Sequence, residues 1–227
     1  MTVMGLQTKR MGLSRTKTKT YLVLTVVLMG LLQAGMRQAQ AQSKLGPAEP
    51  VSYANRYEVY GGLAFMNFMA GEHLPKRMNM GGAEFQGTYW LTRKIGLTAD
   101  YRGLAGTTPV NPNIYRVDRP VVYMNAIMFG AQYRGPKNQY AAVNYHAYAG
   151  PSFGVFDAGT GGQPPQLFGL YTNRTGALVA LGGSLDLNRS KHWAVRVSPD
   201  LILEHFGSET REFVAVSGGV LYRFGKK

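Results

Sequence analysis

The residues of this chain that could act as a nucleophile, base or metal ligand are few and dispersed. Its 227 residues include four histidines, 12 acidic residues and no cysteine, which excludes a disulfide scaffold and zinc sites with thiolate ligands. One stretch near the C-terminus gathers the residue types of a hydrolytic triad in His205, Ser208 and Glu209. Closeness in sequence does not provide triad geometry, and a polar loop contains such residues by chance. We therefore expect no catalytic residue, no metal site and no cofactor, and we expect that the chain is not an enzyme.

Other charged side chains, such as Glu84, Arg102 and Arg196, fall within stretches that alternate apolar and polar residues, which is the pattern of a β-strand with one apolar face. Eight such stretches occur, at 57–65, 83–90, 95–102, 127–134, 143–150, 179–188, 193–198 and 214–224. Short connections alternate with longer ones along the chain. The short ones are 92–94, 135–139 and 189–191, and the longer ones lie near 69–79, 105–120, 154–174 and 206–211. Because outer-membrane barrels have short turns on one side and longer loops on the other, the sequence predicts an all-β, eight-stranded antiparallel up-and-down transmembrane β-barrel.

The first 41 residues have the features of a signal peptide. A basic segment precedes the apolar run Tyr21–Met36, and Ala39-Gln40-Ala41 supplies small residues for cleavage. An uncleaved signal anchor is the alternative, but the apolar run is shorter than the roughly 20 residues that a spanning helix needs. We expect a mature chain with a flexible lead-in at 42–56 and an outer-membrane β-barrel at 57–227.

Removal of the signal peptide changes the charge of the protein. Six of the 25 basic residues and none of the 12 acidic ones lie in residues 1–41, which leaves 19 basic against 12 acidic residues and a net charge of +7. No later stretch resembles a basic recognition helix. We therefore expect no nucleic acid among the partners.

Strand register follows from the short turns. A three-residue turn at 92–94 places Glu84 directly across from Arg102 on the polar face. Closure of the barrel brings the first and last strands together and sets Glu58 beside Arg223. We predict that both pairs are ion pairs inside the barrel.

The same reasoning applies to two other turns. The turn between the sixth and seventh strands pairs Ser184 with Arg196 and leaves Asp186 diagonal to Arg196. The turn between the fourth and fifth strands places His146 close to Met128, with no serine or aspartate beside the imidazole. We predict an ion pair between Asp186 and Arg196 and interpret His146 as an interior histidine without a catalytic role.

Alternation by itself fits both a transmembrane barrel and a soluble lipocalin-like barrel, which would turn the apolar face inward. Opposed charges at matched positions on the polar face favour a polar interior. Aromatic residues near strand ends of the apolar face favour the girdles of a membrane barrel. They are Tyr57, Tyr89, Tyr101, Tyr133, Tyr222 and Phe224. An eight-stranded barrel is just wide enough to be filled by its own side chains, so a large diffusion pore is not expected.

The chain closes on Ser217-x-Gly219-x-x-Tyr222-x-Phe224, which combines a polar residue, a glycine and two spaced aromatics. With the signal peptide and the eight alternating stretches, this ending resembles the outer-membrane β-barrel family that includes the transmembrane domain of outer-membrane protein A. The stretch 180–200 is similar to the sixth and seventh strands of that family. The resemblance implies that the four closing residues form the signal read by the barrel-assembly machinery. It also implies localisation in the outer membrane of a Gram-negative type of cell envelope.

The long connections would carry whatever binding specificity the protein has. Arg116 and Arg119 are candidate contacts for anionic lipopolysaccharide at the membrane edge. We expect a monomer with a structural or surface-interaction role, whose partners are outer-membrane lipid, lipopolysaccharide and, during insertion, the barrel-assembly machinery. The alternatives are a narrow channel for small solutes, a lipid-directed enzyme at the outer rim and a soluble lipocalin-like binding protein of the periplasm.

Overall fold

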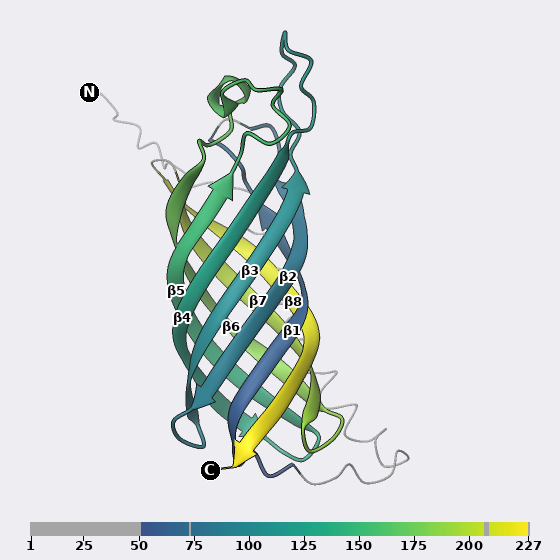
Figure 1. Cartoon of the computed structure of the whole chain (residues 1–227), viewed down its shortest axis with the longest axis vertical. Helices are drawn as coiled ribbons and strands as arrows, with labels where there is room; N and C mark the ends of the chain where they lie inside the picture. The colour runs from purple at the N-terminus through teal and green to yellow at the C-terminus, as the bar shows by residue number, and fades with distance from the viewer. Residues whose placement is uncertain (1–50, 73, 207–208, 227) are drawn as a thin grey trace, which may run out of the picture. The chain divides into compact units, whose positions relative to one another are not determined.

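The structure, a computed structural model, describes residues 51–72, 74–206 and 209–226, and in them eight strands form a closed antiparallel barrel (Figure 1). Each strand pairs with its neighbours in sequence, and β8 pairs with β1. The strands are β1 (Asn55–Phe68), β2 (Met78–Trp90), β3 (Ile95–Thr107), β4 (Val121–Lys137), β5 (Ala141–Val155), β6 (Arg174–Asn188), β7 (Trp193–Phe206) and β8 (Glu209–Lys226). The predicted eight-stranded up-and-down barrel is confirmed. The predicted signal peptide and residues 42–50 of the predicted lead-in lie outside the described residues.

The strands are 13 to 18 residues long and extend beyond the alternating stretches, mainly toward the long loops. Near the C-terminal end of β1, the outward-facing Phe65 and the inward-facing Met66 and Phe68 are all apolar. A strand that is apolar on both faces loses its period of two, which is why the sequence pattern ended too early. No helix among the described residues is both long and apolar enough to cross a membrane.

One end of the barrel, which we call the turn end, carries three tight turns that share one hydrogen-bonding pattern. In each turn a side-chain oxygen accepts hydrogen bonds from the backbone amides two and three residues further on, a common device of tight turns. The acceptors are Thr92 (3.1 and 2.9 Å), Asn138 (2.8 and 2.8 Å) and Ser190 (3.3 and 3.1 Å). The opposite end, which we call the loop end, carries the longer connections, including the short 3-10 helix η2 (Pro165–Phe168).

The observed register confirms one turn prediction and corrects two. Glu84 pairs with Arg102 as predicted. Arg196 lies directly across from Asp186, so the predicted diagonal was wrong; the turn is centred on Lys191, one residue later than assumed. His146 lies across from Gln132 rather than near Met128, because β4 continues through a bulge to Lys137 before the chain turns. These shifts decide which interior residues of β4 and β5, and of β6 and β7, lie opposite each other.

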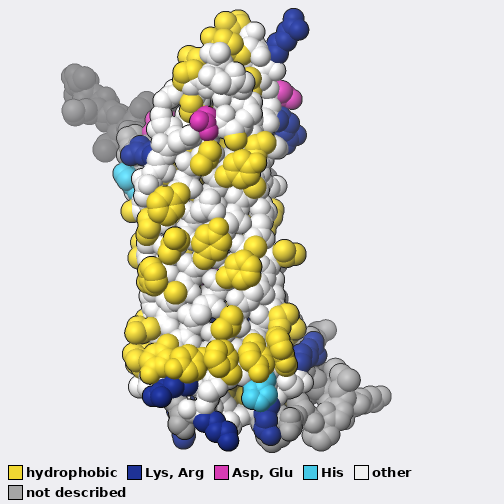
Figure 2. Space-filling view, in the orientation of Figure 1, with side chains coloured by type: hydrophobic (Ala, Val, Ile, Leu, Met, Phe, Trp, Pro, Cys, Tyr) yellow, Lys and Arg dark blue, Asp and Glu magenta, His cyan; other side chains and the backbone are white. Residues whose placement is uncertain are grey.

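Large apolar side chains cover the outer wall of the barrel, with Leu63 76 % and Phe129 62 % exposed. At the turn end they form a ring, visible in Figure 2 as a continuous hydrophobic band with Lys and Arg just beyond it. Its aromatic members touch: the ring centroids of Tyr57 and Phe224 are 5.3 Å apart, and those of Trp193 and Tyr222 are 4.6 Å apart. Such a ring matches the aromatic girdle of a membrane barrel. A soluble lipocalin-like barrel would instead turn its apolar face inward and its polar face outward.

Candidate functional site

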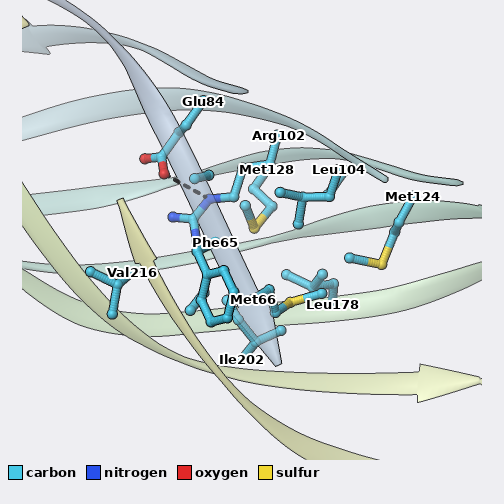
Figure 3. Close-up of a pocket in the computed structure, with 13 residues that line it drawn as sticks. Phe65, Met66, Glu84, Arg102, Leu104, Met124, Met128, Leu178, Ile202 and Val216 are labelled. Carbon is cyan, nitrogen blue, oxygen red and sulfur yellow. Dashed lines mark ion pairs between the residues drawn. The ribbon is translucent and has the colours of Figure 1, made fainter. Parts of the chain in front are cut away.

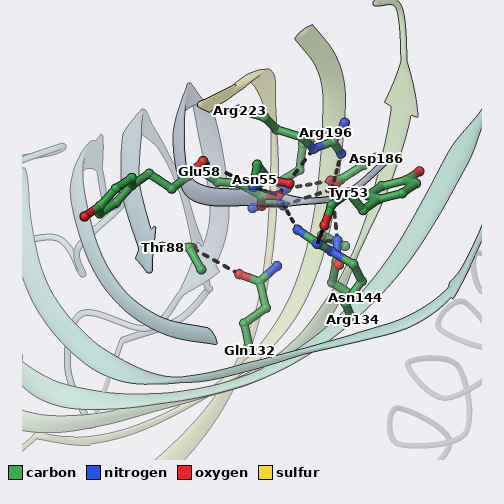
Figure 4. Close-up of polar contacts among 12 residues, drawn as sticks. Tyr53, Asn55, Glu58, Thr88, Gln132, Arg134, Asn144, Asp186, Arg196 and Arg223 are labelled. Carbon is green, nitrogen blue, oxygen red and sulfur yellow. Dashed lines mark hydrogen bonds and ion pairs between the residues drawn. The ribbon is translucent and has the colours of Figure 1, made fainter. Parts of the chain in front are cut away.

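Two acidic residues and three arginines from five strands meet inside the turn half of the barrel (Figure 4). Glu58 forms ion pairs with Arg134, with Arg223 (3.3 Å) and with Arg196 (3.4 Å). Asp186 pairs with Arg196 at 2.7 Å and with Arg223 at 3.1 Å. All five side chains are at most 2 % exposed. The pairs predicted from register, Glu58 with Arg223 and Asp186 with Arg196, are therefore part of one shared network.

A second cluster lies directly above the first, toward the loop end. Arg102 approaches Asp200 at 2.6 Å, Asp100 at 3.1 Å and Glu84, its predicted partner, at 3.5 Å. The imidazole Nε2 of His146 lies 2.6 Å from the other carboxylate oxygen of Asp200. His146 thus has an aspartate beside it, contrary to the prediction. The prediction considered only neighbouring strands, and β5 and β7 are not neighbours. Asp200 and Arg196 lie on the same face of β7, so the alternation of that strand could have placed Asp200 in the interior.

Gln86 joins the two clusters. Its amide nitrogen donates to Glu84 at 2.6 Å and to Asp100 at 2.9 Å, and its oxygen accepts a hydrogen bond from Arg196 at 3.1 Å. We call the five carboxylates, four arginines, Gln86 and His146 the charged layer. The numbers of opposite charges almost balance, and buried charges need such partners. The arrangement pairs these buried charges with one another inside the barrel.

Tyr53 closes the turn end of the charged layer. Its side chain is buried, its hydroxyl donates to the carbonyl oxygen of Asn138 at 2.7 Å, and it accepts from the Asn188 amide at 2.6 Å. The guanidinium carbons of Arg134 and Arg223 lie 5.2 and 5.1 Å from the centroid of its ring. Burial raises the pKa of the Tyr53 hydroxyl above its usual value, which keeps the hydroxyl protonated as a donor. Sequence analysis placed this residue in a flexible lead-in and missed its role as a plug.

The loop half of the interior is apolar, and we call it the apolar chamber. It contains methionine, phenylalanine, leucine and alanine side chains, and all six methionines of the described residues lie in it or against it. They are Met66, Met69, Met78, Met80, Met124 and Met128. A polar interior was predicted throughout, so the chamber is a correction, caused by the loss of alternation in the loop half. The cavity at its floor, lined on one side by Glu84 and Arg102 (Figure 3), has a volume of only about 10 Å³.

Side chains from the loops close the chamber. Leu74, Val110, Phe168, Leu170 and Tyr171 are buried at the loop end and belong to the same apolar cluster. The Tyr171 backbone amide donates to the carbonyl oxygen of Ala70 at 2.9 Å and ties two loops together. A cavity of about 10 Å³ corresponds to roughly one water molecule.

One carboxylate interrupts the chamber. Glu204 is 1 % exposed, and neither of its oxygens has a hydrogen-bond partner of good geometry among the described residues. The Ser152 hydroxyl faces it but donates to the carbonyl oxygen of Gly176 at 3.4 Å. Arg211 lies across the β7–β8 ladder and makes interactions of its own. Sequence analysis did not single out this residue.

Of the three triad candidates, only His205 has a described side chain. His205 is exposed, and its Nδ1 lies 2.9 Å from the Thr210 hydroxyl; Ser208 and the Glu209 side chain lie outside the described residues. Among the residues that the structure describes, no group of three metal-ligating side chains occurs. Arg116 and Arg119 are exposed in the loop between β3 and β4.

The closing pattern divides between the two faces of β8. Ser217 and Gly219 face the interior, where Ser217 accepts a hydrogen bond from Tyr60 at 3.1 Å. A Cβ atom at Gly219 would lie 2.2 Å from the carbonyl oxygen of Gly61, so the seam with β1 needs glycine there. Tyr222 and Phe224 face outward and stack at 5.8 Å. Reading of this pattern by the assembly machinery stays a prediction.

No family model matches the sequence, and no curated protein matches it. Solved structures do match. Neisserial surface protein A is 12 % identical, with a TM-score of 0.52 over 74 % of this chain and 97 % of that one. The Ail protein of Yersinia pestis is 17 % identical (TM-score 0.47, 75 % and 99 %), and the N-terminal barrel of Pseudomonas aeruginosa OprF is 14 % identical (0.44, 75 % and 98 %). At these identities the likeness concerns the fold alone, and the predicted resemblance to small outer-membrane β-barrels is confirmed in that sense.

Proposed function

We propose that this protein is an integral outer-membrane β-barrel with a structural or surface-binding role and without a transport conduit. The observation that carries the proposal is the contrast between the two faces of the sheet. Apolar side chains and an aromatic ring cover the outer wall, while ion pairs, Tyr53 and the apolar chamber fill the interior. A sheet of this kind is stable only in a bilayer or a substitute for one.

The interior argues against the narrow channel. A conduit needs a path of water or of exchangeable polar groups. In both clusters of the charged layer, however, the carboxylates form ion pairs with the arginines of the layer. Above it, the apolar chamber would have to lose packed methionine and phenylalanine side chains before a solute could pass. Opening would therefore cost packing energy and would also leave charges unpaired.

The outer-membrane location has support from two sides. The N-terminal 41 residues have a secretion signal pattern, and small outer-membrane barrels share the fold. A periplasmic lipocalin-like protein would stay soluble after cell fractionation, whereas we expect this protein in the detergent-extracted envelope fraction. The folded protein should also migrate differently on a gel before and after boiling, because folded membrane barrels resist detergent.

Conductance decides between a filled scaffold and a channel. Wild-type protein in planar bilayers should show no single-channel steps. Glu58→Ala together with Tyr53→Ala removes the turn-end plug and should allow at most brief openings, because the chamber still blocks the loop half. Regular conductance steps of the wild-type protein would reject the scaffold and favour the channel.

For the surface-binding role we propose lipopolysaccharide as a ligand of Arg116 and Arg119. Both side chains are exposed at the loop end, where they could reach phosphate groups at the membrane edge. Arg116→Glu with Arg119→Glu should lower lipopolysaccharide retention by the purified barrel several-fold. Arg189→Glu with Lys191→Glu, an equal charge reversal at the turn end, is the matched control and should have no effect. Equal losses in both double variants would contradict the assignment.

A further inference from the structure

A shallow groove runs along the outer wall near the turn end, over β1 to β4. Its volume is about 610 Å³, which falls within the roughly 300–1,000 Å³ typical of ligand sites. Small residues form its floor, at Gly87 on β2 and Ala99 on β3, and Val59, Leu97 and Phe129 form its walls. Charged and polar neighbours such as Glu58 contribute only backbone, because their side chains face the interior. The groove therefore offers an apolar surface to a hydrocarbon chain.

Gly87 creates the depth of the groove. A Cβ atom at this position would meet no heavy atom within 4 Å, so the missing side chain leaves open space on the outer wall. Gly87 pairs with Val59 on one side and with Ala99 on the other, which places a glycine and an alanine side by side between larger neighbours. Tyr57, Tyr89 and Phe224 end the groove at the aromatic ring.

On the face that Figure 2 shows, Lys and Arg side chains lie at the turn end just beyond this ring. The cations of the turn end are Arg56, Arg93, Lys94, Lys137, Arg189, Lys191 and Lys226, all exposed. No exposed acidic side chain accompanies them among the described residues. The exposed acids of the described chain are all at the loop end, namely Glu72, Asp118, Asp157 and Glu212. The two ends therefore differ in charge, and only the turn end is uniformly positive.

Three of these cations lie next to the groove. The guanidinium carbon of Arg56 is 5.6 Å from the centroid of the Tyr89 ring, which ends the groove. Arg93 and Lys94 belong to the turn that joins β2 and β3, the two strands that form the groove floor. An apolar groove that ends at an aromatic ring and a cluster of cations matches the acyl chain and the phosphate of one phospholipid molecule.

We propose that the groove binds an acyl chain of an anionic phospholipid in the leaflet at the turn end, and that Arg56, Arg93 and Lys94 bind its phosphate. The proposal rests on the proposed membrane location, and it names a specific lipid site on the barrel. Charge complementarity selects this occupant: a zwitterionic lipid would fill the groove equally well but would gain less from the cations, each of which contributes roughly a fivefold preference for an anionic surface. A second copy of this chain would place two positive turn ends side by side.

Native mass spectrometry of the folded barrel in detergent tests the site. The probes are phosphatidylglycerol and phosphatidylcholine with identical acyl chains. Wild-type protein should retain one phosphatidylglycerol in preference to phosphatidylcholine. Gly87→Leu fills the groove and should weaken retention of both lipids about fivefold or more. Arg56→Gln with Arg93→Gln and Lys94→Gln should remove most of the preference for phosphatidylglycerol while phosphatidylcholine retention stays unchanged.

Gly81→Leu is the matched control. Gly81 lies on the same strand and the same outer face, its Cβ position is equally open, and it is outside the groove. This variant should bind both lipids like wild type. Equal behaviour of the two leucine variants, a Gly87→Leu protein that retains lipid normally, or a wild-type dimer that Gly87→Leu converts to a monomer would overturn the proposal. Heat-modifiable migration verifies that each variant is folded, and its absence in the wild-type protein would instead reject the membrane barrel itself.

Discussion

The two halves of the barrel interior are held together by different interactions. In the turn half, Glu58 and Asp186 are shared among three arginines from separate strands. In the loop half, methionine and phenylalanine side chains dominate the packing, and Glu204 is a buried carboxylate among them. Ion pairs depend on geometry and on a partner of opposite charge, whereas methionine adapts to irregular space. One closed sheet thus combines a rigid end with an adaptable one.

The largest effect should come from the charged layer. Glu58→Gln removes the carboxylate that pairs with Arg134, which has no other ion pair among the described residues. We expect the free energy of unfolding to fall by about 3–5 kcal/mol, because a buried arginine loses its counter-charge. Urea unfolding in lipid vesicles measures the change. Adding Arg134→Gln should restore part of the loss, and a fall of under about 1 kcal/mol would show that the layer behaves like a surface network.

The apolar chamber should respond to lost volume rather than to changed chemistry. Phe68→Ala removes a ring that contacts Phe213 at 4.8 Å and Phe156 at 6.5 Å between centroids. We expect it to lower the free energy of unfolding by about 3 kcal/mol. Met128→Leu keeps the volume and should cost less than about 1.5 kcal/mol in the same urea titration. Similar losses of unfolding free energy for both variants would contradict the inference that the loop half adapts to a change of side-chain shape.

Tyr53 tests the boundary between the charged layer and water. Tyr53→Phe leaves the Asn188 amide and the Asn138 carbonyl without this partner, at a cost of about 1–2 kcal/mol. Its raised folded-state pKa means that this stability is fully present below the unfolded pKa of about 10 and is lost as pH rises through the folded-state value. Unfolding titrations at neutral and alkaline pH should therefore converge for the two proteins. A difference that grew with pH would contradict the plug.

The smallest effect should be a gain in the loop half. Glu204→Leu replaces a buried carboxylate that has no hydrogen-bond partner of good geometry, so the free energy of unfolding should rise by about 1 kcal/mol. Glu212→Leu, at an exposed position on β8, should change it by less than about 0.5 kcal/mol. A destabilised Glu204→Leu protein would show that this carboxylate has an interior partner.

The sequence predicted the barrel because alternation survives where the interior is polar. Glu84 and Arg102 were placed correctly, since the turn at Thr92 fits its expected length. The register of β6 and β7 moved because the turn centres on Lys191, and one residue of uncertainty in a turn shifts opposed pairs by two. The prediction missed the ends of strands where both faces are apolar, because the alternation of apolar and polar residues stops there.

Contacts across the lumen could not be predicted from neighbouring strands. His146 and Asp200 meet from β5 and β7, with β6 between them. Tyr53 precedes the first strand and carries no periodic signal at all. Both placements depend on the curvature of the closed sheet, which pairwise register does not contain.

The contacts of Tyr53 also suggest when this residue docks during folding of the barrel. Its partners include Asn138 and Asn188 at two separate turns and Arg223 on the last strand, and β8 pairs with β1, the strand that follows the tyrosine. We expect the tyrosine to dock after the ring of strands has closed, so that its contacts are absent from the transition state of closure. Its replacement should speed unfolding and leave the rate of folding nearly unchanged, so that this single side chain acts as a latch on a finished barrel.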